Sequence, residues 1–245
     1  MLYYAIGDVH GCADALDRLL VQIQADAAER ADGRDWRIVM LGDYVDRGPD
    51  SAGVLSRVME LDRRGHIVLP GNHEALMHAA LSAQSDDAET PARRWWENGG
   101  KQTLKSYGAR RLSARKPQRS FDVVPGDHRA FLADILEARA VHHLDRGDGL
   151  FFVHAGVRPE EPLAETAREV MLWSRAPAFM DADGPRWVEG LRVVHGHTPT
   201  DTAQIHDHRV GLDTGAVYGG VLSCGVFDGG ELAAVLETPG APSGA

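Results

Sequence analysis

The stretch Gly42-Asp43-Tyr44-Val45-Asp46-Arg47-Gly48 gives the first indication of the fold. It follows an apolar run at 37–41 that is typical of a buried strand, and a helix start at 49–51 comes directly after it. Two carboxylates and a guanidinium therefore lie in a turn at the carboxyl end of a strand, where open α/β sheets bind their ligands. Such a cluster is costly without counter-ions, and a metal ion together with a phosphate would supply them.

The same order of apolar strand, polar turn and helix occurs twice more in the first third of the chain. Residues 2–7 lead into Gly7-Asp8-Val9-His10-Gly11, and residues 66–69 lead into Gly71-Asn72-His73-Glu74. Apolar residues spaced i, i+3, i+4 and i+7 after the first of these turns predict a helix with one buried stripe. Three such units predict an α/β fold with a βαβ-type core whose polar turns share one edge.

The second half of the chain contains further candidate strands. Residues 150–153 end at His154-Ala155-Gly156, and residues 191–194 end at His195-Gly196-His197-Thr198-Pro199. Glycine turns separate three later stretches, which predict a second, more antiparallel sheet: 209–213, 221–227 and 231–236.

Residues 82–140 interrupt this pattern with repeated prolines and glycines, and they predict a helical insertion over the core of a single domain that spans 1–237. Within the insertion, 93–119 contains nine lysines and arginines against one acid, Glu97. Two interpretations are open: a solvated basic face, which is slightly favoured, or a positive rim that attracts anionic substrate. Residues 238–245 are predicted to form a disordered tail.

Composition narrows the possible classes of function. With 245 residues, 43% of them hydrophobic, the chain can bury a sizeable core. The net charge of −10 argues against general nucleic-acid binding, which normally needs a basic excess. Two cysteines far apart in sequence, Cys12 and Cys224, indicate a reducing compartment with neither a disulfide framework nor a thiolate metal site. No apolar run approaches membrane-spanning length and the amino terminus lacks a signal-peptide pattern, so we expect a cytoplasmic protein with no membrane association.

Oxygen and imidazole side chains follow five of the predicted strands. The residues at these strand ends are Asp8 and His10, Asp43, Asn72 with His73, His154, and His197. Aspartate, histidine and asparagine without thiolates suit divalent ions such as Mn²⁺, Fe²⁺ or Zn²⁺. Even six ligands from this set are too many for one catalytic ion that keeps open positions, but they fit two ions that share a carboxylate.

In order and spacing, the five polar turns quoted above resemble the signature of the phosphoprotein-phosphatase family of binuclear metallophosphoesterases. The likeness is closest to the bacterial and lambda-phage-like members, and it runs from about residue 1 to about residue 228. It implies the calcineurin-like metallophosphoesterase fold, in which two mixed β-sheets pack as a central sandwich flanked by helices.

The resemblance also implies two divalent metal ions, most simply Mn²⁺, with Fe or Zn as alternatives. Carried over residue by residue, the ligands of the first ion are Asp8 and His10, the bridging ligand is Asp43, and the second ion is completed by Asn72, His154 and His197. His195 competes with His197, because a spacing of two on a strand puts both side chains on one side. The family pattern favours His197 and leaves His195 a supporting or structural role.

The catalytic assignments come from the same resemblance. Asp46 and His73 correspond to a carboxylate and imidazole pair in which His73 protonates the leaving oxygen. Arg47 and Arg175, the latter in Leu172-Trp173-Ser174-Arg175, correspond to arginines that bind phosphoryl oxygens. In the same resemblance, Tyr218 corresponds to an active-site tyrosine. The expected substrate contacts are Arg47, Asn72, Arg175 and Tyr218.

These assignments predict a metal-dependent phosphomonoesterase that hydrolyses phosphoserine or phosphothreonine in proteins or peptides, and small aryl phosphoesters, by direct attack of a metal-bridging hydroxide. The alternative is a symmetrical dinucleoside tetraphosphate hydrolase, and a less favoured alternative is a non-catalytic phosphate-binding module. Asp46-Arg47 and Glu74 favour the protein phosphatase, whereas Trp96-x-Asn98-Gly99-Gly100 resembles insertions of both enzymes. Trp95 and Trp96 themselves are interpreted as the core of the insertion.

Overall fold

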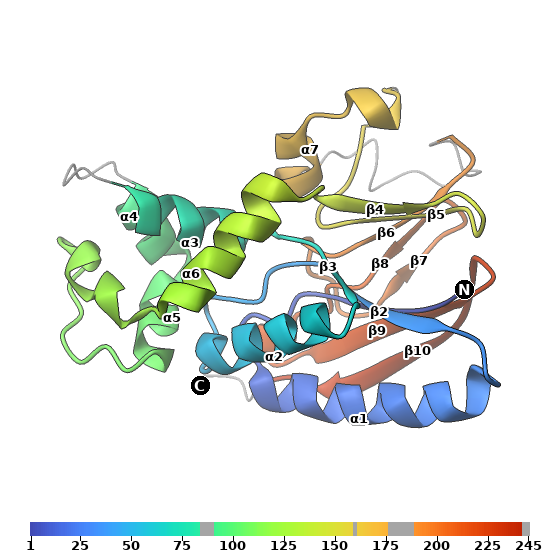
Figure 1. The fold of residues 1–245 in the computed structure, drawn as a ribbon, viewed down its shortest axis with the longest axis horizontal. Coiled ribbons are helices and arrows are strands. Elements are labelled where there is room, and N and C mark those ends of the chain that lie inside the picture. Colours follow the sequence, from blue (N-terminus) through green and yellow to red (C-terminus); the bar gives the residue numbers. More distant parts are fainter. Residues whose placement is uncertain (84–90, 159–160, 176–188, 242–245) are drawn as a thin grey trace.

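A computed structural model describes residues 1–83, 91–158, 161–175 and 189–241 of the chain. Within this part, two five-stranded mixed sheets pack face to face and helices cover their outer faces (Figure 1). The fold class predicted from the sequence is thereby confirmed.

The first sheet carries the three strand, turn and helix units predicted from the amino-terminal motifs. Its order is β10-β9-β1-β2-β3, with β1 Leu2–Ile6, β2 Trp36–Met40, β3 Ile67–Val68, β9 Val221–Asp228 and β10 Glu231–Pro239. Strands β1, β2 and β3 run parallel, and α1 (Ala13–Arg30) and α2 (Ser51–Arg63) connect them. Because parallel strands end at the same edge, the polar turns after all three lie together.

The second sheet supplies the remaining two polar turns. Its order is β4-β5-β6-β8-β7, with β4 His142–Asp145, β5 Leu150–Val153, β6 Arg192–His195, β7 Gln204–Ile205 and β8 Arg209–Gly211. Strands β5, β6 and β8 run parallel, while β4 and β7 are antiparallel to their neighbours.

The sequence prediction for the last two strands was wrong in one respect. Strands β9 and β10 belong to the first sheet, where β9 pairs antiparallel with β1 and β10 pairs antiparallel with β9. Strand β10 also continues to Pro239, two residues past the boundary expected at 237. Thr238 is buried, and Arg18 donates hydrogen bonds to its Oγ1 (3.0 Å) and to Pro239 O (2.6 Å). The remainder of the expected tail, 242–245, lies outside the described residues.

Both faces of strand β1 are buried, because each meets a different layer. Leu2, Tyr4 and Ile6 pack in the core that lies beneath α1 and α2, whereas Tyr3 and Ala5 pack between the two sheets. The residues that meet Tyr3 and Ala5 from the second sheet include Leu150, Phe152, Val194 and Val210. Burying apolar surface at roughly 25 cal/mol per Å² on both faces is what holds the strand ends, and hence the polar turns, in place.

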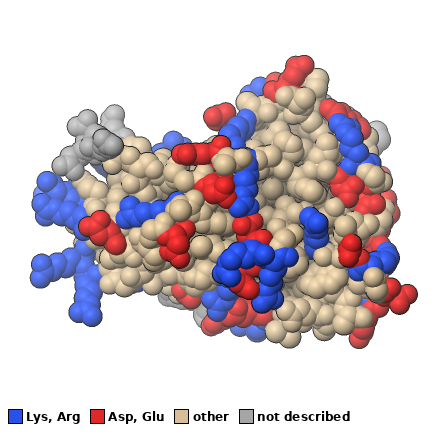
Figure 2. Space-filling view, in the orientation of Figure 1, with Lys and Arg blue, Asp and Glu red and all other residues tan. Residues whose placement is uncertain are grey.

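The described segments between α3 (Asn72–Ser82) and β4, from Pro91 onward, are mainly helical and form one end of the molecule (Figure 1). They comprise α4 (Pro91–Trp95), α5 (Lys101–Ser106), α6 (Gly126–Ala133) and the short helical turns Trp96–Gly100, Pro117–Val123 and Asp134–Ala138. Lysine and arginine side chains gather at this end (Figure 2), and every basic residue of 93–119 is exposed. A solvated basic face therefore describes most of them.

On the other side, α7 (Arg168–Trp173) covers the outer face of the second sheet. The described residues contain two further helical turns, Leu163–Glu165 and Ala216–Tyr218. Among the described residues, no helix combines the length and the apolar character needed to cross a bilayer.

Candidate metal centre

Turns from both sheets meet at one site, as their positions after parallel strands predict. The turn after β1 lies against the turn after β2, where the backbone N–H groups of Val9 and His10 donate to Asp43 O at 3.1 and 2.8 Å. The N–H of His197, after β6, donates to the carboxylate of Asp8 at 3.0 Å. Two glycines make room for this approach, because a Cβ at Gly71 would lie 2.2 Å from Asp43 Oδ1 and a Cβ at Gly196 would lie 2.1 Å from Asp8 Oδ1.

Asp43 is the carboxylate shared by two possible metal sites. Its Oδ2 lies 3.4 Å from His10 Nε2, and its Oδ1 lies 3.4 Å from His154 Nε2. In the described part of the chain, two buried groups of side chains could each hold a metal ion: His10, Asp43 and His73, and Asp43, His154 and His197. Burial opposes ionisation of Asp43, but the neighbouring histidines outweigh it and its pKa lies below the ordinary range. The shared carboxylate is therefore charged.

The backbone fixes which ring nitrogen of each histidine carries a lone pair. His10 Nδ1 lies 2.8 Å from Val45 O, and His154 Nδ1 lies 2.9 Å from Leu41 O. A carbonyl can only accept, so Nδ1–H donates and Nε2 is left as the electron-pair donor that faces Asp43. Burial lowers the pKa of both imidazoles, that of His10 to about 3, which keeps them neutral as metal ligands must be.

A site that binds cations should contain electron-pair donors that no hydrogen-bond donor satisfies. Several such lone pairs are present here. His154 Nε2 lies 2.9 Å from Asn72 Oδ1 as well as 3.4 Å from Asp43 Oδ1, so three acceptors converge. His197 Nδ1 is buried and finds no hydrogen-bond partner among the described residues. Converging oxygen and imidazole lone pairs are what a divalent cation of the Mn²⁺, Fe²⁺ or Zn²⁺ type binds. The residues present fit two such ions.

The buried ligand groups differ from the predicted ligand set: they include His73 and leave out Asp8. His73, predicted as the acid, has its Nε2 4.0 Å from Asp43 Oδ2 and so falls into the first metal group. Asp8 is buried beside this centre, where burial, Asp213 and Asp43 raise its pKa. The metal content of a His73 variant distinguishes a metal ligand from a general acid, because only the loss of a ligand should lower it.

Asp46 and His73 form the predicted pair, and the insertion holds it. His73 Nδ1 lies 2.7 Å from Asp46 Oδ2, and the other oxygen, Oδ1, accepts from Trp95 Nε1 at 2.8 Å and from Thr103 Oγ1 at 2.7 Å. The backbone N–H of Asp46 donates to Ser51 Oγ at 3.0 Å. Burial lowers the pKa of His73, but the charge of Asp43 and the hydrogen bond of Asp46 outweigh it, so its net pKa is raised.

We expect Trp95→Phe and Thr103→Val each to disturb this pair. Phenylalanine keeps an aromatic ring but is smaller and loses the N–H, and valine keeps the shape of threonine but loses the hydroxyl. A hydrogen bond to a charged group stabilises by about 1.5–3 kcal/mol, and removal of such an outer partner typically lowers activity roughly 10- to 100-fold. Denaturant unfolding and kcat measure the two effects, and Thr103→Ser, which keeps the hydroxyl, is the control. Unchanged kcat in both Trp95→Phe and Thr103→Val would show that the pair does not depend on these hydrogen bonds from the insertion.

The structure brings the predicted phosphate-binding residues to the same place. Arg47 Nη1 lies 2.6 Å from His10 Nε2, and its Nη2 lies 2.8 Å from His73 Nε2. Arg175 Nη2 donates to His197 O at 3.1 Å. Tyr218 is 60% exposed, and its ring centroid lies 5.8 Å from Arg47 Cζ. Arg47 and Arg175 therefore border the metal groups, and Tyr218 lies beside Arg47.

His195, the rival of His197, belongs to neither metal group of the described residues. It is buried, its Nδ1 lies 3.0 Å from Gly196 O, and Arg209 Nη1 lies 3.4 Å from its Nε2.

Backbone strain is concentrated in the site. Five residues other than glycine have positive φ there: His10 (42°), Asp43 (53°), Asp46 (75°), Arg47 (68°) and His197 (69°). Each such residue costs of the order of 1–3 kcal/mol and persists only where its surroundings enforce it. Here the strained turns aim carboxylate, imidazole and guanidinium groups at one point.

Two further residues belong to the site: Asp213, to which the sequence analysis gave no role, and Glu74, whose structural role the motif did not reveal. Asp213 follows β8 as Asp43 follows β2, and it is buried beside Asp8; burial, opposed by a hydrogen bond from the Gly215 N–H, raises its pKa to about 6. A carboxylate directly after a strand was the signal available for it. Glu74 accepts from the backbone N–H groups of Gly71, Asp43, Tyr44 and Val45, at 2.8 to 3.2 Å, and so ties two turns together.

Comparison with known proteins agrees with this geometry. The family described as Calcineurin-like phosphoesterase matches residues 1–218. The chain is 26% identical over 239 residues to the asymmetrical bis(5'-nucleosyl)-tetraphosphatase PrpE of Halalkalibacterium halodurans, a match that covers 91% of this chain and 89% of the relative. It is 32% identical over 203 residues to the symmetrical bis(5'-nucleosyl)-tetraphosphatase of a Janthinobacterium species, covering 82% of this chain and 58% of that relative.

Solved structures show the same fold. A candidate diadenosine tetraphosphatase aligns over 98% of this chain and 94% of its own, with a TM-score of 0.65 and 22% identity. A serine/threonine phosphatase of Saccharomyces cerevisiae aligns over 100% of this chain and 81% of its own, with a TM-score of 0.52 and 16% identity. The family match over most of the chain and the two buried ligand groups lead to one conclusion: the chain belongs to the calcineurin-like phosphoesterase family and is a metal-dependent phosphoesterase.

Proposed function

We propose that the protein hydrolyses dinucleoside tetraphosphates, with two divalent cations, Mn²⁺ first among them, at the candidate metal centre. The observation that carries this proposal is the pair of relatives above, both named bis(5'-nucleosyl)-tetraphosphatases, one of which matches about nine-tenths of each chain. Their names differ in the position of cleavage, symmetrical or asymmetrical. The alternative considered in the sequence analysis thus becomes the main proposal.

Glu74, which resembles the protein-phosphatase pattern in sequence, has a structural role. Its carboxylate is fully buried and accepts hydrogen bonds from backbone N–H groups. A side chain in that position cannot contact a substrate. The likeness to the yeast serine/threonine phosphatase, at 16% identity, concerns the fold alone.

We assign the metal ligands as predicted. The buried groups support His10, Asp43, His154 and His197, whereas Asp8 is assigned from its burial beside them. Asp43, whose two oxygens each face a different histidine, would help to hold both cations. The first cation would take Asp8 and His10, and the second would take Asn72, His154 and His197. Two cations held in this way would lower the pKa of a bound water and neutralise charge on the phosphoryl group.

The remaining roles belong to side chains that surround these ligands. Arg47 and Arg175 would bind phosphoryl oxygens, since a guanidinium matches two of them at once and offsets charge that grows in the transition state. His73 would give its proton to the leaving oxygen, and Asp46 would hold the ring in the orientation this requires. Asn72 and Tyr218 would complete the substrate contacts.

The test is a direct comparison of substrates with the manganese-loaded protein. Diadenosine tetraphosphate and a phosphoserine peptide are supplied separately, and nucleotide products are resolved by chromatography. Two molecules of ADP indicate symmetrical cleavage, and ATP with AMP indicates asymmetrical cleavage. Turnover of the peptide with no cleavage of the dinucleotide would overturn the proposal in favour of the protein phosphatase.

A further inference from the structure

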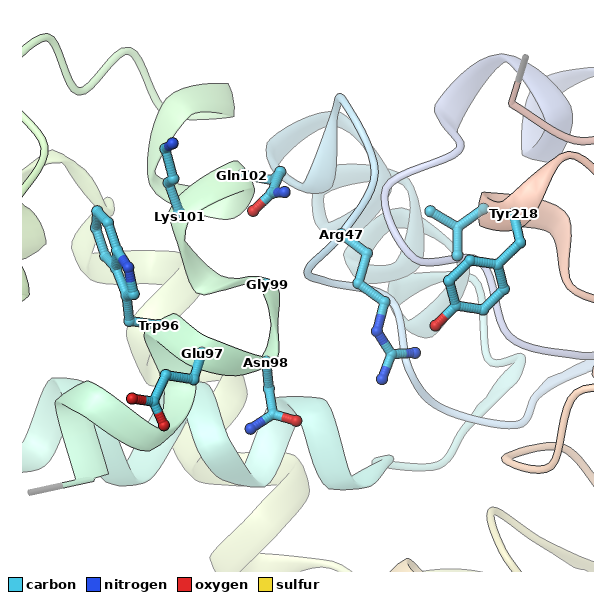
Figure 3. Close-up of a pocket in the computed structure, with 9 residues that line it drawn as sticks. Arg47, Trp96, Glu97, Asn98, Gly99, Lys101, Gln102 and Tyr218 are labelled. Atoms are coloured by element: carbon cyan, nitrogen blue, oxygen red, sulfur yellow. The ribbon is translucent and has the colours of Figure 1, made fainter. Parts of the chain in front are cut away.

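A cavity of about 720 Å³ opens beside Arg47, between the insertion and the helical turn that carries Tyr218 (Figure 3). This volume is within the range of pockets that enclose small organic ligands. The side chains that matter for its chemistry are Arg47, Trp96, Asn98, Lys101, Gln102 and Tyr218. They come from three separate parts of the chain, so the folded arrangement alone creates the cavity.

One end of the cavity is the catalytic site itself. Arg47 lines the cavity and also contacts His10 and His73, as described above. Its backbone N–H donates to Gly99 O at 3.4 Å, which attaches the insertion directly to the turn that bears Arg47. A phosphoryl group bound by Arg47 would therefore have room for the rest of its molecule in this cavity.

The other end of the cavity offers flat aromatic and amide surfaces. Figure 3 shows Trp96 on the side opposite Arg47 and Tyr218, with Lys101 and Gln102 along the wall between them. Trp96 is half-buried, packs against the apolar core and is one of the residues that line the cavity. An indole supports stacking of a nucleobase, and the nearby amides of Asn98 and Gln102 can donate to or accept from its edge.

The charge of the cavity favours an anion, although the protein as a whole carries −10. Lys101 is exposed and has no carboxylate partner among the described residues. The acid on the same wall, Glu97, is paired with Arg93 at 2.8 Å. Arg47 and Lys101 thus leave a positive cavity with an aromatic far end.

We propose that this cavity binds the leaving nucleotide: its base stacks on Trp96, and Lys101 neutralises the phosphates that lie between the base and Arg47. A nucleotide is the ligand class that joins several phosphates to a flat aromatic ring, and the cavity offers a counterpart for each. The inference rests on the proposed function and deepens it. It gives a binding place to the nucleotide portion, which a dinucleotide has and a simple phosphate ester lacks.

The first test compares diadenosine tetraphosphate with p-nitrophenyl phosphate, which has no nucleoside. Loss of base stacking should raise KM for the dinucleotide roughly five- to a hundredfold in Trp96→Ala, and the ratio of the two kcat/KM values should fall accordingly. Trp96→Phe, which keeps an aromatic face, should recover most of this ratio. Equal losses for both substrates in Trp96→Ala, or no loss for either, would overturn the proposal.

Lysine variants test the charge without touching the core. Lys101→Gln should raise KM for the dinucleotide about three- to tenfold, as expected for an exposed charge on phosphate. Lys105→Gln is the matched control, because Lys105 is exposed on the same helix but does not line the cavity. An equal effect of the two variants would mean that only overall charge matters.

Calorimetric binding of ADP and of inorganic phosphate separates this inference from the proposed function. The wild type should bind ADP more tightly than phosphate, and Trp96→Ala should lose that difference. A protein that fails to cleave the dinucleotide but shows this pattern would contradict the proposed activity and keep the nucleotide site. ADP affinity that is the same in the wild type and Trp96→Ala would refute the site, whatever the activity.

Discussion

Replacement of His73 by asparagine is expected to lower kcat by about a hundredfold for diadenosine tetraphosphate and by up to about ten-thousandfold for a phosphoserine peptide. The difference arises because a serine alkoxide is a far more basic leaving group than a nucleotide phosphate, whose last pKa is near 6. Departure of the serine oxygen therefore depends more strongly on protonation by His73. Metal analysis of the purified variant should still find both ions, since the proposed ligand set does not include His73.

The pH profile gives a second measurement of the same role. Because Asp43 and Asp46 raise the net pKa of His73, its protonated form extends to higher pH than that of an ordinary imidazole and is lost as the pH rises further. We therefore expect the rate with an alkyl phosphate to fall on the alkaline side, and this fall to be absent in His73→Asn.

The matched control is His78→Asn, on the same helix, where the histidine pairs with Glu137 at the surface. That variant should retain kcat. If His73→Asn lost a metal ion together with activity, His73 would be a ligand, as its distance to Asp43 permits, and the acid would have to be sought elsewhere.

Asp43→Asn is expected to weaken both metal sites at once. The carboxylate faces His10 with one oxygen and His154 with the other, so the loss of its charge reaches both groups. Metal ions contribute several kcal/mol to the stabilisation of such transition states, and 1.36 kcal/mol is a factor of ten, so kcat/KM should fall about a thousandfold or more. Metal content, measured by elemental analysis after dialysis, should fall from two ions towards none.

Asparagine is the appropriate replacement because Asp43 has a φ of 53°, a conformation that asparagine tolerates. Asp32→Asn is the control, since Asp32 also has positive φ (47°) but lies exposed in the turn between α1 and β2. If Asp43→Asn kept both ions at full affinity, Asp43 would not be the bridging ligand.

The sequence was sufficient for the parts of the structure that depend on local order along the chain. Each of the first three polar turns follows a short apolar strand, and parallel strands must end at one edge, so the meeting of Asp8, Asp43 and Asn72 could be predicted. The left-handed φ of His10 and Asp43 agrees with this placement, because each lies in a tight turn between strand and helix.

The errors and omissions concern contacts between distant segments. Periodicity identifies β9 as a strand but cannot tell that it pairs with β1, more than 200 residues earlier, and so it was placed in the wrong sheet. Trp95 looked like ordinary core because its ring is apolar, and only the folded arrangement shows its N–H reaching Asp46. Both contacts depend on tertiary packing between distant segments. Such contacts have no characteristic spacing that could be recognised in a single sequence.

Substrate preference was the least accessible property for a related reason. The motifs belong to the metal centre, which phosphoesterases acting on different substrates can share, whereas the cavity near Trp96 is formed by the insertion. Glu74 was read as part of a protein-phosphatase pattern, but its carboxylate accepts hydrogen bonds from the backbone and gives no information about the substrate.

The origin of the metal ligands has a mechanical consequence. In the second group, Asp43 follows β2 of one sheet, whereas His154 and His197 follow β5 and β6 of the other. The two sheets face each other through apolar side chains, so a cation in this group would act as a cross-link at the open end of the sandwich. Its binding free energy, about 2.7 kcal/mol at a hundredfold excess over Kd, would oppose separation of the layers. Chelation should therefore lower the melting temperature and speed proteolysis, and the same ions that support hydrolysis would hold the two layers together.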